Sequence, residues 1–361
     1  MSRARALINL AAIERNCARL KPSGVELCAV VKADAYGHGA VPCARAALAG
    51  GATWLAVAAA AEAKELRDAG IDAAILVMGA LTRAELEQAV GCRADVVAWT
   101  EELIAWASAS RGGGARVHVK LDSGMGRLGT RDVELADRLV AAIEQHPKLE
   151  LGGLMTHFAT ADERGDGFFA EQLERFSAWT ARHPQRFAHA ANSAATLREA
   201  RSHFGMVRCG VGIYGLDPFG RDGGSGLEPA LELESWVAAV KPVGPGDSAG
   251  YGRRFVADRR TMLGVVPVGY GDGVRRGLTN NADVFIDDRR HPLVGTVSMD
   301  NVTVDLGPDT RVEVGARAVL LGGGEITAEE LAERLDTINY EITCGVAARV
   351  PRTYHRDGLG A

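Results

Sequence analysis

Lys32 is the residue with the clearest potential for covalent chemistry. It directly follows the unbroken apolar run Leu27–Val31, which is typical of a buried strand. Apolar walls at a strand end favour the neutral amine, which can attack an aldehyde and form a Schiff base. Arginine cannot replace it there, because a guanidinium stays protonated. The segment Lys-Ala-Asp-Ala-Tyr-Gly-His-Gly, which begins at Lys32, favours this role over that of a solvated surface lysine.

Polar side chains also follow several later apolar runs. The second, third and fourth apolar runs are followed by residues without reactive side chains. We therefore expect the other strands to supply the site residues. In a sheet of parallel strands the carboxyl ends meet at one face, where catalytic groups gather. The candidates are Lys120 and Arg127 after the fifth run, His157 after the sixth, Asn192 and Ser193 after the seventh, and Arg208 at the eighth.

A glycine-rich segment raises the question of phosphate binding. Gly210–Gly215 matches the pattern G-x-G-x-x-G, but a dinucleotide site needs a helix to open there. The next residues, Leu216–Gly224, are typical of a loop, so we reject that site. The amides of Gly210 and Val211 can still approach a phosphate, and Ser193 can add a hydroxyl and a helix N-terminal amide. A Schiff-base lysine together with a phosphate cradle indicates a pyridoxal 5′-phosphate site.

The elements that must position these residues alternate between short β-rich runs and longer amphipathic stretches. Eight such units predict an α/β fold with an N-terminal (β/α)8 barrel, and a doubly wound sheet is the alternative. The predicted strands are Leu27–Val31, Trp54–Ala58, Ala74–Met78, Asp95–Trp99, Val117–Leu121, Leu151–Met155, Phe187–Ala190 and Met206–Cys209. The predicted helices include Ala60–Ala69, Arg131–Gln145 and Phe168–Arg182.

The pattern changes past residue 225, where glycine and proline become denser and the apolar runs become short and β-branched. This pattern is typical of antiparallel strands joined by turns, with one late helix. We therefore expect a cofactor-binding barrel over residues 1–225 and a C-terminal, mainly antiparallel β domain over residues 226–361. Its predicted elements are the strands Met262–Val268, Val284–Ile286, Val302–Val304 and Ala318–Leu321, and the helix Ala328–Leu335.

Composition limits the classes of function. The 361 residues carry 41 cationic and 46 anionic side chains, so no basic excess points to a nucleic-acid partner. The six cysteines lie far apart without ligand spacing, so we expect no metal site, no disulfide framework and a reduced compartment. The longest apolar runs, Trp54–Ala61 and Ala73–Leu81, fall short of the ~18–20 residues that span a bilayer. We expect a cytoplasmic protein. Only six of its cations are lysines.

Seven motifs, in order along nearly the whole chain, resemble those of the alanine racemase family. Four lie in the predicted barrel: Val31–Gly39, Lys120–Gly129, Thr156–Asp162 and Val207–Gly210. Three lie in the predicted β domain: Ala249–Gly252, Pro267–Gly273 and Gly295–Asp300. The resemblance implies a homodimeric pyridoxal 5′-phosphate enzyme that interconverts L-alanine and D-alanine, for cell-wall precursors or for alanine catabolism.

Two acid/base groups are implied by this resemblance. Lys32 would hold the cofactor and serve as one of them, and Tyr251 would be the other. Racemisation needs such a pair, because the Cα proton must leave from one face of a planar centre and return on the opposite face. In the family, the counterparts of Tyr251 and Met299 reach the site from the second subunit.

The resemblance also implies the remaining roles. Arg208 would face the pyridine nitrogen, and His157 would orient Arg208 or Tyr251. Arg127 and the Met299 amide would bind the substrate carboxylate, and a carbamylated Lys120 would hold Arg127. The other cofactor-binding residues are the phosphate ligands Tyr36, Ser193, Gly210 and Val211, together with Asn192.

Two positions depart from the family pattern. Ala348 stands where some members have a tyrosine near the phosphate or the substrate entry, and Ser298 stands where a cysteine is common. Two other functions compete with racemisation. A barrel-type amino-acid decarboxylase would need a catalytic cysteine and a different glycine signature. A cofactor-homeostasis protein would lack the second domain altogether.

Overall fold

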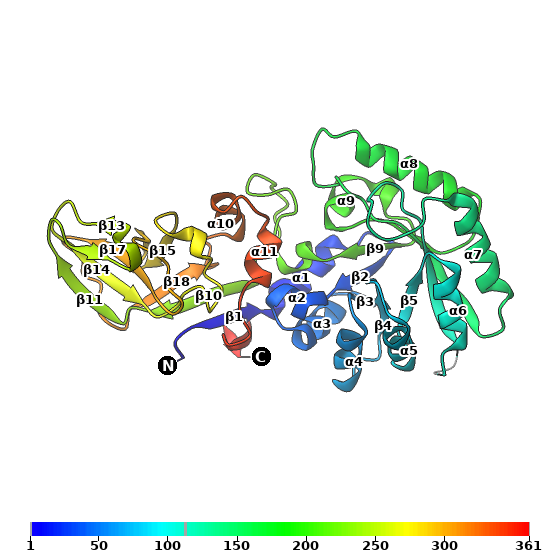
Figure 1. The fold of residues 1–361 in the computed structure, drawn as a ribbon, viewed down its shortest axis with the longest axis horizontal. Helices are drawn as coiled ribbons and strands as arrows, with labels where there is room; N and C mark the ends of the chain where they lie inside the picture. Colours follow the sequence, from blue (N-terminus) through cyan, green and yellow to red (C-terminus); the bar gives the residue numbers. More distant parts are fainter. Residues whose placement is uncertain (1, 112–113, 361) are drawn as a thin grey trace. The chain divides into compact units, whose positions relative to one another are not determined.

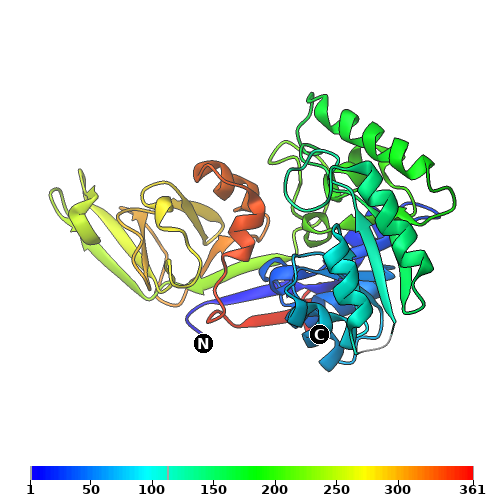
Figure 2. The same cartoon turned by 45° about the vertical axis from the view of Figure 1, so that its right-hand side comes forward.

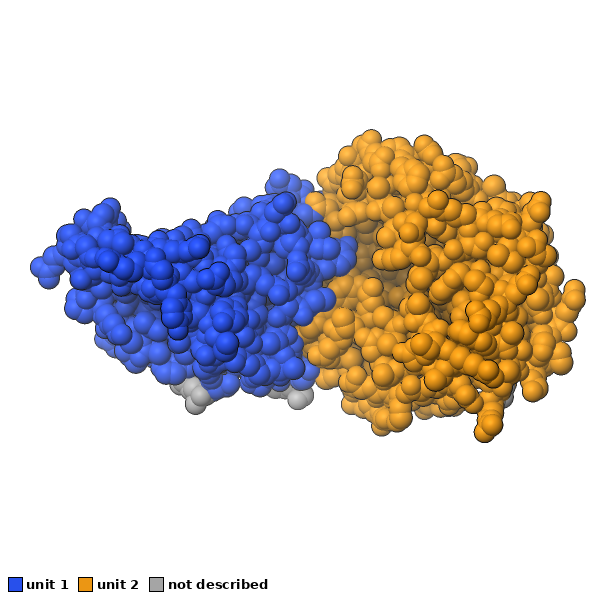
Figure 3. Space-filling view, viewed as in Figure 1, with its two compact units in different colours: residues 1–12, 220–224, 228–361 blue, residues 13–219, 225–227 orange. Residues whose placement is uncertain are grey.

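The computed structural model describes residues 2–111 and 114–360. Contacts divide the chain into two compact units, which Figure 3 colours separately. Unit 2 comprises residues 13–219 and 225–227, and unit 1 comprises residues 1–12, 220–224 and 228–361. The sequence boundary at 225 left residues 1–12 with the barrel, whereas the structure groups them with the C-terminal residues. The reason is the pairing of an N-terminal strand, described below.

Unit 2 is a closed barrel of eight parallel strands, as predicted, with helices around it (Figures 1 and 2). The barrel closes where the first strand pairs with both the second and the last. All eight predicted runs form strands, with ends shifted by up to two residues. The strands are β2 (Glu26–Val30), β3 (Trp54–Val57), β4 (Ala74–Val77), β5 (Asp95–Ala98), β6 (Ala115–Lys120), β7 (Leu149–Met155), β8 (Ala188–His189) and β9 (Met206–Cys209).

The helices of unit 2 follow from their caps and apolar faces. Thr82 accepts a hydrogen bond from the Glu85 amide, and the Glu85 carboxylate accepts one from the Thr82 amide, which closes a capping box. A short helix opens at Ser193, as expected, and the Asn192 side chain caps it by accepting from the Ala195 amide. The helices are α1 (Leu10–Leu20), α2 (Lys32–Gly37), α3 (Ala40–Ala49), α4 (Ala60–Asp68), α5 (Arg83–Gly91), α6 (Glu101–Ala109), α7 (Val133–Gln145), α8 (Phe168–Ala181) and α9 (Ser193–Arg198), with 3₁₀ turns η1 (Ala200–Ser202) and η2 (Val211–Tyr214).

Unit 1 is built on a seven-stranded sheet in the order β16-β15-β18-β10-β1-β19-β20. The N-terminal strand β1 (Arg5–Asn9), which the sequence did not predict, lies inside this sheet between β10 and β19. Its pairing with β10 is antiparallel, but its pairing with β19 is parallel. The other strands of this sheet are β10 (Leu231–Trp236), β15 (Asp283–Ile286), β16 (Arg289–Pro292), β18 (Arg317–Leu321), β19 (Arg352–Arg356) and β20 (Leu359–Gly360).

Two smaller sheets and two helices complete unit 1. The predicted helix near residue 328 is present, and a second short helix follows it. The elements are β11 (Ala239–Val243), β12 (Ser248–Ala249), β13 (Phe255–Val256), β14 (Thr261–Val266), β17 (Val302–Gly307), α10 (Ala328–Arg334) and α11 (Asn339–Cys344), with 3₁₀ turns η3 (Tyr251–Arg253) and η4 (Arg276–Leu278). Among the described residues, no helix has both the length and the apolar character that crossing a membrane requires.

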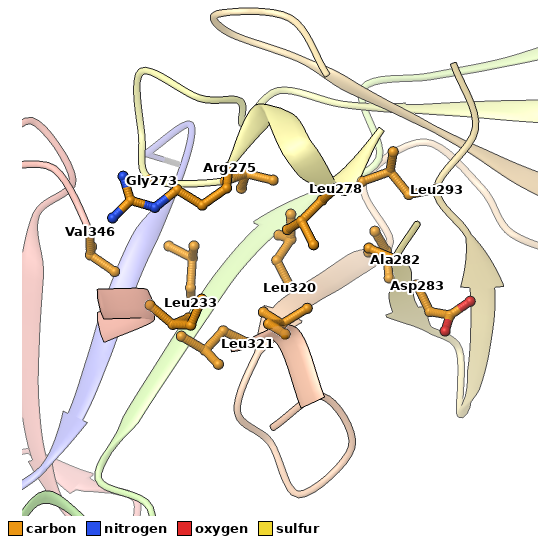
Figure 4. Close-up of a pocket in the computed structure, with 14 residues that line it drawn as sticks. Leu233, Gly273, Arg275, Leu278, Ala282, Asp283, Leu293, Leu320, Leu321 and Val346 are labelled. Carbon is orange, nitrogen blue, oxygen red and sulfur yellow. The ribbon is translucent and has the colours of Figure 1, made fainter. Parts of the chain in front are cut away.

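The core of unit 1 contains a small internal cavity of about 30 Å³. Figure 4 shows Leu278 and Leu320 turned toward one another around it. Its wall is almost entirely leucine, isoleucine, valine and alanine, with Arg275 and Asp283 at the margin. A ligand site needs convergent polar groups. We therefore assign this space to imperfect packing of the core.

Candidate active site

A pocket of about 200 Å³ in unit 2 collects positive charge. Its described lining holds four cationic side chains and no carboxylate: Lys32, Lys120, Arg127 and Arg208. These residues come from the carboxyl-terminal halves of barrel strands or from the loops that follow them. His157 lines the same pocket. Five residues singled out from the sequence therefore meet at one place, and that place calls for an anionic ligand.

Lys120 is a buried amine that lies close to other cations. It is the last residue of β6 and is only 5 % exposed. Burial, followed by the nearby charges of Arg208 and Arg127, lowers the pKa of its amine from 10.5 to about 8. A substantial neutral fraction near neutral pH makes this amine a nucleophile.

Arg208 lies inside the barrel on β9, held by neutral acceptors. Its Nη2 donates to the carbonyl of Thr156 at 2.7 Å and to that of Ala190 at 3.0 Å. Its Nη1 lies 2.7 Å from Nδ1 of His189. Burial lowers the pKa of this guanidinium to about 10, so it remains charged at neutral pH. Arg208 is therefore a fixed donor and a permanent cation.

His157 is a neutral neighbour of this arginine. Its Nδ1 lies 3.4 Å from Nη2 of Arg208. Burial and then the charge of Arg208 hold the pKa of His157 well below its usual range. The imidazole is therefore neutral at physiological pH and accepts from the guanidinium.

The residues after Lys32 form one turn of left-handed helix. Ala33, Asp34, Ala35 and Tyr36 all have φ between 52° and 54°. Each such residue costs roughly 1–2 kcal/mol relative to a right-handed conformation. Specific contacts offset this cost: the amide of Ala33 donates to the Glu62 carboxylate at 2.6 Å, and the Asp34 carboxylate accepts from the Ala40 amide at 2.7 Å. The turn is consistent with strain held at a functional site.

Three loops form an anion-binding cradle next to this turn. The amides of Gly210 and Gly212 both donate to the Ser193 hydroxyl at 3.1 Å. A Cβ at position 210 would lie 2.4 Å from the Tyr36 hydroxyl, so only glycine permits this approach. Tyr214 supports the Tyr36 ring at a centroid distance of 5.2 Å. The loops follow the neighbouring strands β2, β8 and β9.

The loop that carries Arg127 is folded by an aspartate. Asp122 accepts hydrogen bonds from the amides of Gly124 and Gly126 at 3.1 and 3.0 Å, and from Nε of Arg131 at 3.0 Å. Burial alone would raise the pKa of Asp122, but these donors lower it. Asp122 therefore shapes the turn and leaves Arg127 to face the pocket.

The two remaining sequence candidates lie in unit 1 and are exposed. Tyr251 is 76 % exposed and Met299 is 52 % exposed. The Thr296 hydroxyl donates to the Tyr251 carbonyl at 2.6 Å, and the Tyr270 amide donates to the Ser298 carbonyl at 3.0 Å. Both tyrosines therefore flank the loop that carries Met299.

A four-residue ion-pair network fixes this loop. Arg3 bridges Asp272 and Asp300 at 2.8 and 2.9 Å, and Arg349 bridges the same two carboxylates at 2.9 Å each. Arg349 also donates to the Met299 carbonyl at 3.2 Å. The network holds the backbone at Met299 while its side chain stays in solvent.

Comparison with known proteins settles the family. The family description "Alanine racemase, N-terminal domain" matches residues 8–218, and "Alanine racemase, C-terminal domain" matches residues 230–354. The chain belongs to the alanine racemase family.

Similar proteins cover nearly the whole chain. Alanine racemase from Thermobifida fusca is 43 % identical over 367 residues, covering 97 % of this chain and 98 % of that protein. Alanine racemase from Geobacillus stearothermophilus is 41 % identical, covering 94 % and 90 %. The solved structure of alanine racemase from Streptomyces coelicolor A3(2) has a TM-score of 0.90 at 42 % identity, covering 97 % of each chain. That of alanine racemase from Bacillus anthracis with bound L-Ala-P has a TM-score of 0.91 at 37 % identity, covering 100 % of this chain and 97 % of that one.

Sequence reasoning missed the residues behind Arg208 in this racemase fold. His189 contacts Arg208 directly, and His118 and Asp95 follow behind it. A signal was present, because His118 and His189 interrupt predicted apolar strands and Asp95 begins one. Asn192, a further sequence candidate, caps α9 through its Oδ1, which accepts from the Ala195 amide at 2.9 Å.

Gly210→Ala tests the cradle of this racemase site. The added methyl must displace the Tyr36 hydroxyl, so we expect a loss of about 1–3 kcal/mol in the free energy of unfolding and weaker binding of inorganic phosphate. The control is Gly91→Ala at the end of α5, where a Cβ meets nothing within 4 Å. Denaturant titration and calorimetry would measure both effects. Equal stability and phosphate affinity in the two variants would contradict the close packing of Tyr36 against Gly210.

Proposed function

We propose that the protein interconverts L-alanine and D-alanine with pyridoxal 5′-phosphate as its cofactor. The observation that carries the proposal is the pocket in which Lys32, Lys120, Arg127 and Arg208 converge without a carboxylate in the described lining. Membership of the alanine racemase family supports the reaction and the substrate.

The residues present fit this cofactor. Its phosphate matches the cradle, where the amides of Gly210 and Gly212 gather around the Ser193 hydroxyl and position 210 lies against the Tyr36 hydroxyl. We assign phosphate binding to Tyr36, Ser193, Gly210 and Val211, and the supporting cap to Asn192. Lys32 supplies the amine that would hold the aldehyde carbon, and the other pocket cations balance the remaining negative charge.

Arg208 would face the ring nitrogen. When bound, the cofactor supplies a conjugated ring that withdraws electrons from the Cα of an attached amino acid. Arg208 is a charged donor held by three neutral acceptors, so it opposes a proton on that nitrogen. Electron density is then retained near Cα, which favours return of a proton there over transamination.

Two groups exchange the Cα proton. Lys32 Nζ acts on one face and the Tyr251 hydroxyl on the other, so that a proton removed from one face is replaced on the opposite face. Arg127 and the Met299 amide bind the substrate carboxylate and so prevent the amino acid from rotating in the site. His157 orients Arg208 through the contact at 3.4 Å.

The assembly we propose is a homodimer with shared active sites. Tyr251, Tyr270 and Met299 are large side chains that a single chain leaves 76 %, 43 % and 52 % exposed. A catalytic phenol in open solvent would be poorly positioned, and burial against a second copy would correct this. We assign Tyr251 and Met299 to the site of the partner subunit, and we place the enzyme in the cytoplasm, supplying D-alanine for cell-wall precursors.

Lys32→Arg should abolish both cofactor attachment and racemisation, because a guanidinium neither forms the imine nor exchanges the proton. We expect activity to fall by at least the 10²–10⁴-fold that acid/base groups contribute. Borohydride trapping with peptide mapping, and solvent-deuterium exchange at Cα of L- and D-alanine, would measure this. Lys64→Arg, a helix-surface lysine paired with Asp68, is the matched control. Trapping at another lysine would contradict the assignment of Lys32 as the cofactor lysine. Release of CO2 from the amino acid would favour a decarboxylase.

Mixing two inactive variants tests the shared site. Lys32→Ala and Tyr251→Phe homodimers should each be inactive, but subunit exchange creates mixed dimers in which one of the two sites has both groups. We expect activity to reappear at up to about one quarter of the unaltered level, because half of randomly mixed dimers are heterodimers with one intact site. Exchange is monitored with fluorescent labels. No recovery after demonstrated exchange would place both groups in one subunit.

Carbamylation of Lys120 is the last element of the proposal, and its signature is a dependence on pH and bicarbonate. Because burial lowers the pKa of the amine from 10.5 to about 8, its charged form destabilises the fold below pH 8. This cost, of order 3 kcal/mol, is relieved as the pH rises from about 8 to 10.5. A carbamate removes the cation and attracts Arg127.

We expect bicarbonate to raise the melting temperature and the turnover of the unaltered protein near neutral pH. Lys120→Met should respond to neither bicarbonate nor the rise in pH, whereas Lys148→Met, at an exposed site, should behave like the unaltered protein. Isotope-labelled bicarbonate would reveal the carbamate carbon by NMR. Absence of that signal, together with an unchanged melting temperature, would contradict carbamylation.

A further inference from the structure

A line of buried polar side chains crosses the barrel interior behind Arg208. Nδ1 of His189 lies 2.7 Å from Nη1 of Arg208, and Nε2 of His189 lies 2.8 Å from Nδ1 of His118. Nε2 of His118 lies 3.0 Å from Oδ2 of Asp95. The four residues come from β5, β6, β8 and β9, and none is more than 6 % exposed. The line therefore ties a carboxylate on one strand to a guanidinium on another.

The barrel is built to admit this line. A Cβ at Gly152 would lie 2.5 Å from the His118 ring, and a Cβ at Gly153 would lie 2.9 Å from it. The pairing of β6 with β7 also shifts register between Val117 and His118. Trp54 closes the other side of the ring at a centroid distance of 5.8 Å. Two glycines and a bulge therefore make room for one buried imidazole.

The chemistry of the end groups fixes the direction of every hydrogen bond. Arg208 can only donate, so Nδ1 of His189 must accept and its proton must sit on Nε2. His118 then accepts at Nδ1 and carries its own proton on Nε2, which it donates to the Asp95 carboxylate. Burial and the charge of Arg208 hold the pKa of His189 well below its usual range, which agrees with a neutral ring. Each ring is restricted to one tautomer.

We propose that Asp95, His118 and His189 form a relay that positions Arg208 for the reaction. The inference rests on the proposed function, in which Arg208 faces the cofactor ring. The carbonyls of Thr156 and Ala190 fix one end of the guanidinium, and the relay supplies the acceptor for the other. Asp95 anchors the relay as an anion, and Arg116, whose Nε lies 3.7 Å from Oδ2 of Asp95, is the further charge that faces it. All three are positioning residues, because Arg208 alone of this line reaches the pocket.

Asp95→Asn tests the relay at nearly constant shape. The amide oxygen can accept from Nε2 of His118 as the carboxylate does. Donation by the amide nitrogen would reverse the line and set an N–H of His189 against Arg208, which can only donate. The variant therefore removes the charge that anchors the line and keeps its direction. The control is Glu150→Gln, which neutralises the exposed carboxylate 3.2 Å from Nε of the same Arg116.

The first readout is NMR of histidine ring nitrogens in the isotope-labelled protein, without any assay of activity. In the unaltered protein and in Glu150→Gln we expect His118 and His189 to be protonated on Nε2 alone. In Asp95→Asn we expect the same tautomers, because Arg208 still requires Nδ1 of His189 to accept, and a shifted Nε2 signal of His118 that records the loss of its charged acceptor. Protonation of either ring on Nδ1 in the unaltered protein would overturn the relay, and this measurement stands even if the variant folds poorly.

The second readout is steady-state racemisation. Asp95→Asn should lower kcat by on the order of tenfold to a hundredfold, as expected for a misplaced group at the reacting centre, while KM for alanine stays within about twofold, since Arg127 and Met299 are untouched. Glu150→Gln should match the unaltered protein in both parameters. Equal kcat in the two variants would overturn the positioning role. If the unaltered protein does not racemise alanine, the proposed function fails, and the tautomers still decide whether the relay exists.

Discussion

Charge balance in the barrel pocket is the constraint on which the rest of the structure depends. Four cations surround a space of about 200 Å³ whose described lining offers no carboxylate, and the pKa of Lys120, lowered to about 8, records the cost. A protein normally avoids buried charge unless something of opposite sign is present. The nearby amides of Gly210 and Gly212 are donors as well. The pocket therefore carries uncompensated positive charge, which an anionic ligand would neutralise.

The side chains around this pocket are held in place by a strained backbone turn and by buried hydrogen-bond partners. The left-handed turn Ala33–Tyr36 holds Lys32 and Tyr36 in a fixed relation, at a cost that tertiary contacts with Glu62 and Ala40 offset. Arg208 is likewise held by carbonyls and by an imidazole, not by a flexible ion pair. In unit 1 the loop of Met299 is held differently, by ion pairs of Arg3 and Arg349 with Asp272 and Asp300.

The sequence predicts most of this fold because the barrel strands are buried on both sides and read as continuous apolar runs. It also predicts Lys32, Lys120, Arg127, His157 and Arg208, because polar residues at strand ends stand out against those runs. The left-handed turn is not predictable, since alanine and tyrosine rarely adopt positive φ. The strand β1 escapes prediction because both of its partners lie beyond the whole barrel in the sequence, and a period of two over five residues is a weak signal. Tyr251 depends on family resemblance, because its isolated sequence context is only a tyrosine between glycines.

The position of β1 has a consequence for the order of events during synthesis. Residues 5–9 leave the ribosome before the barrel, yet their hydrogen-bonding partners β10 and β19 are made only after the whole barrel. Because domains generally fold as they emerge, the barrel can close while this first strand still has two unsatisfied edges. An unpaired strand is a template for aggregation. Expression of this protein should therefore be sensitive to chaperones that shield a nascent chain.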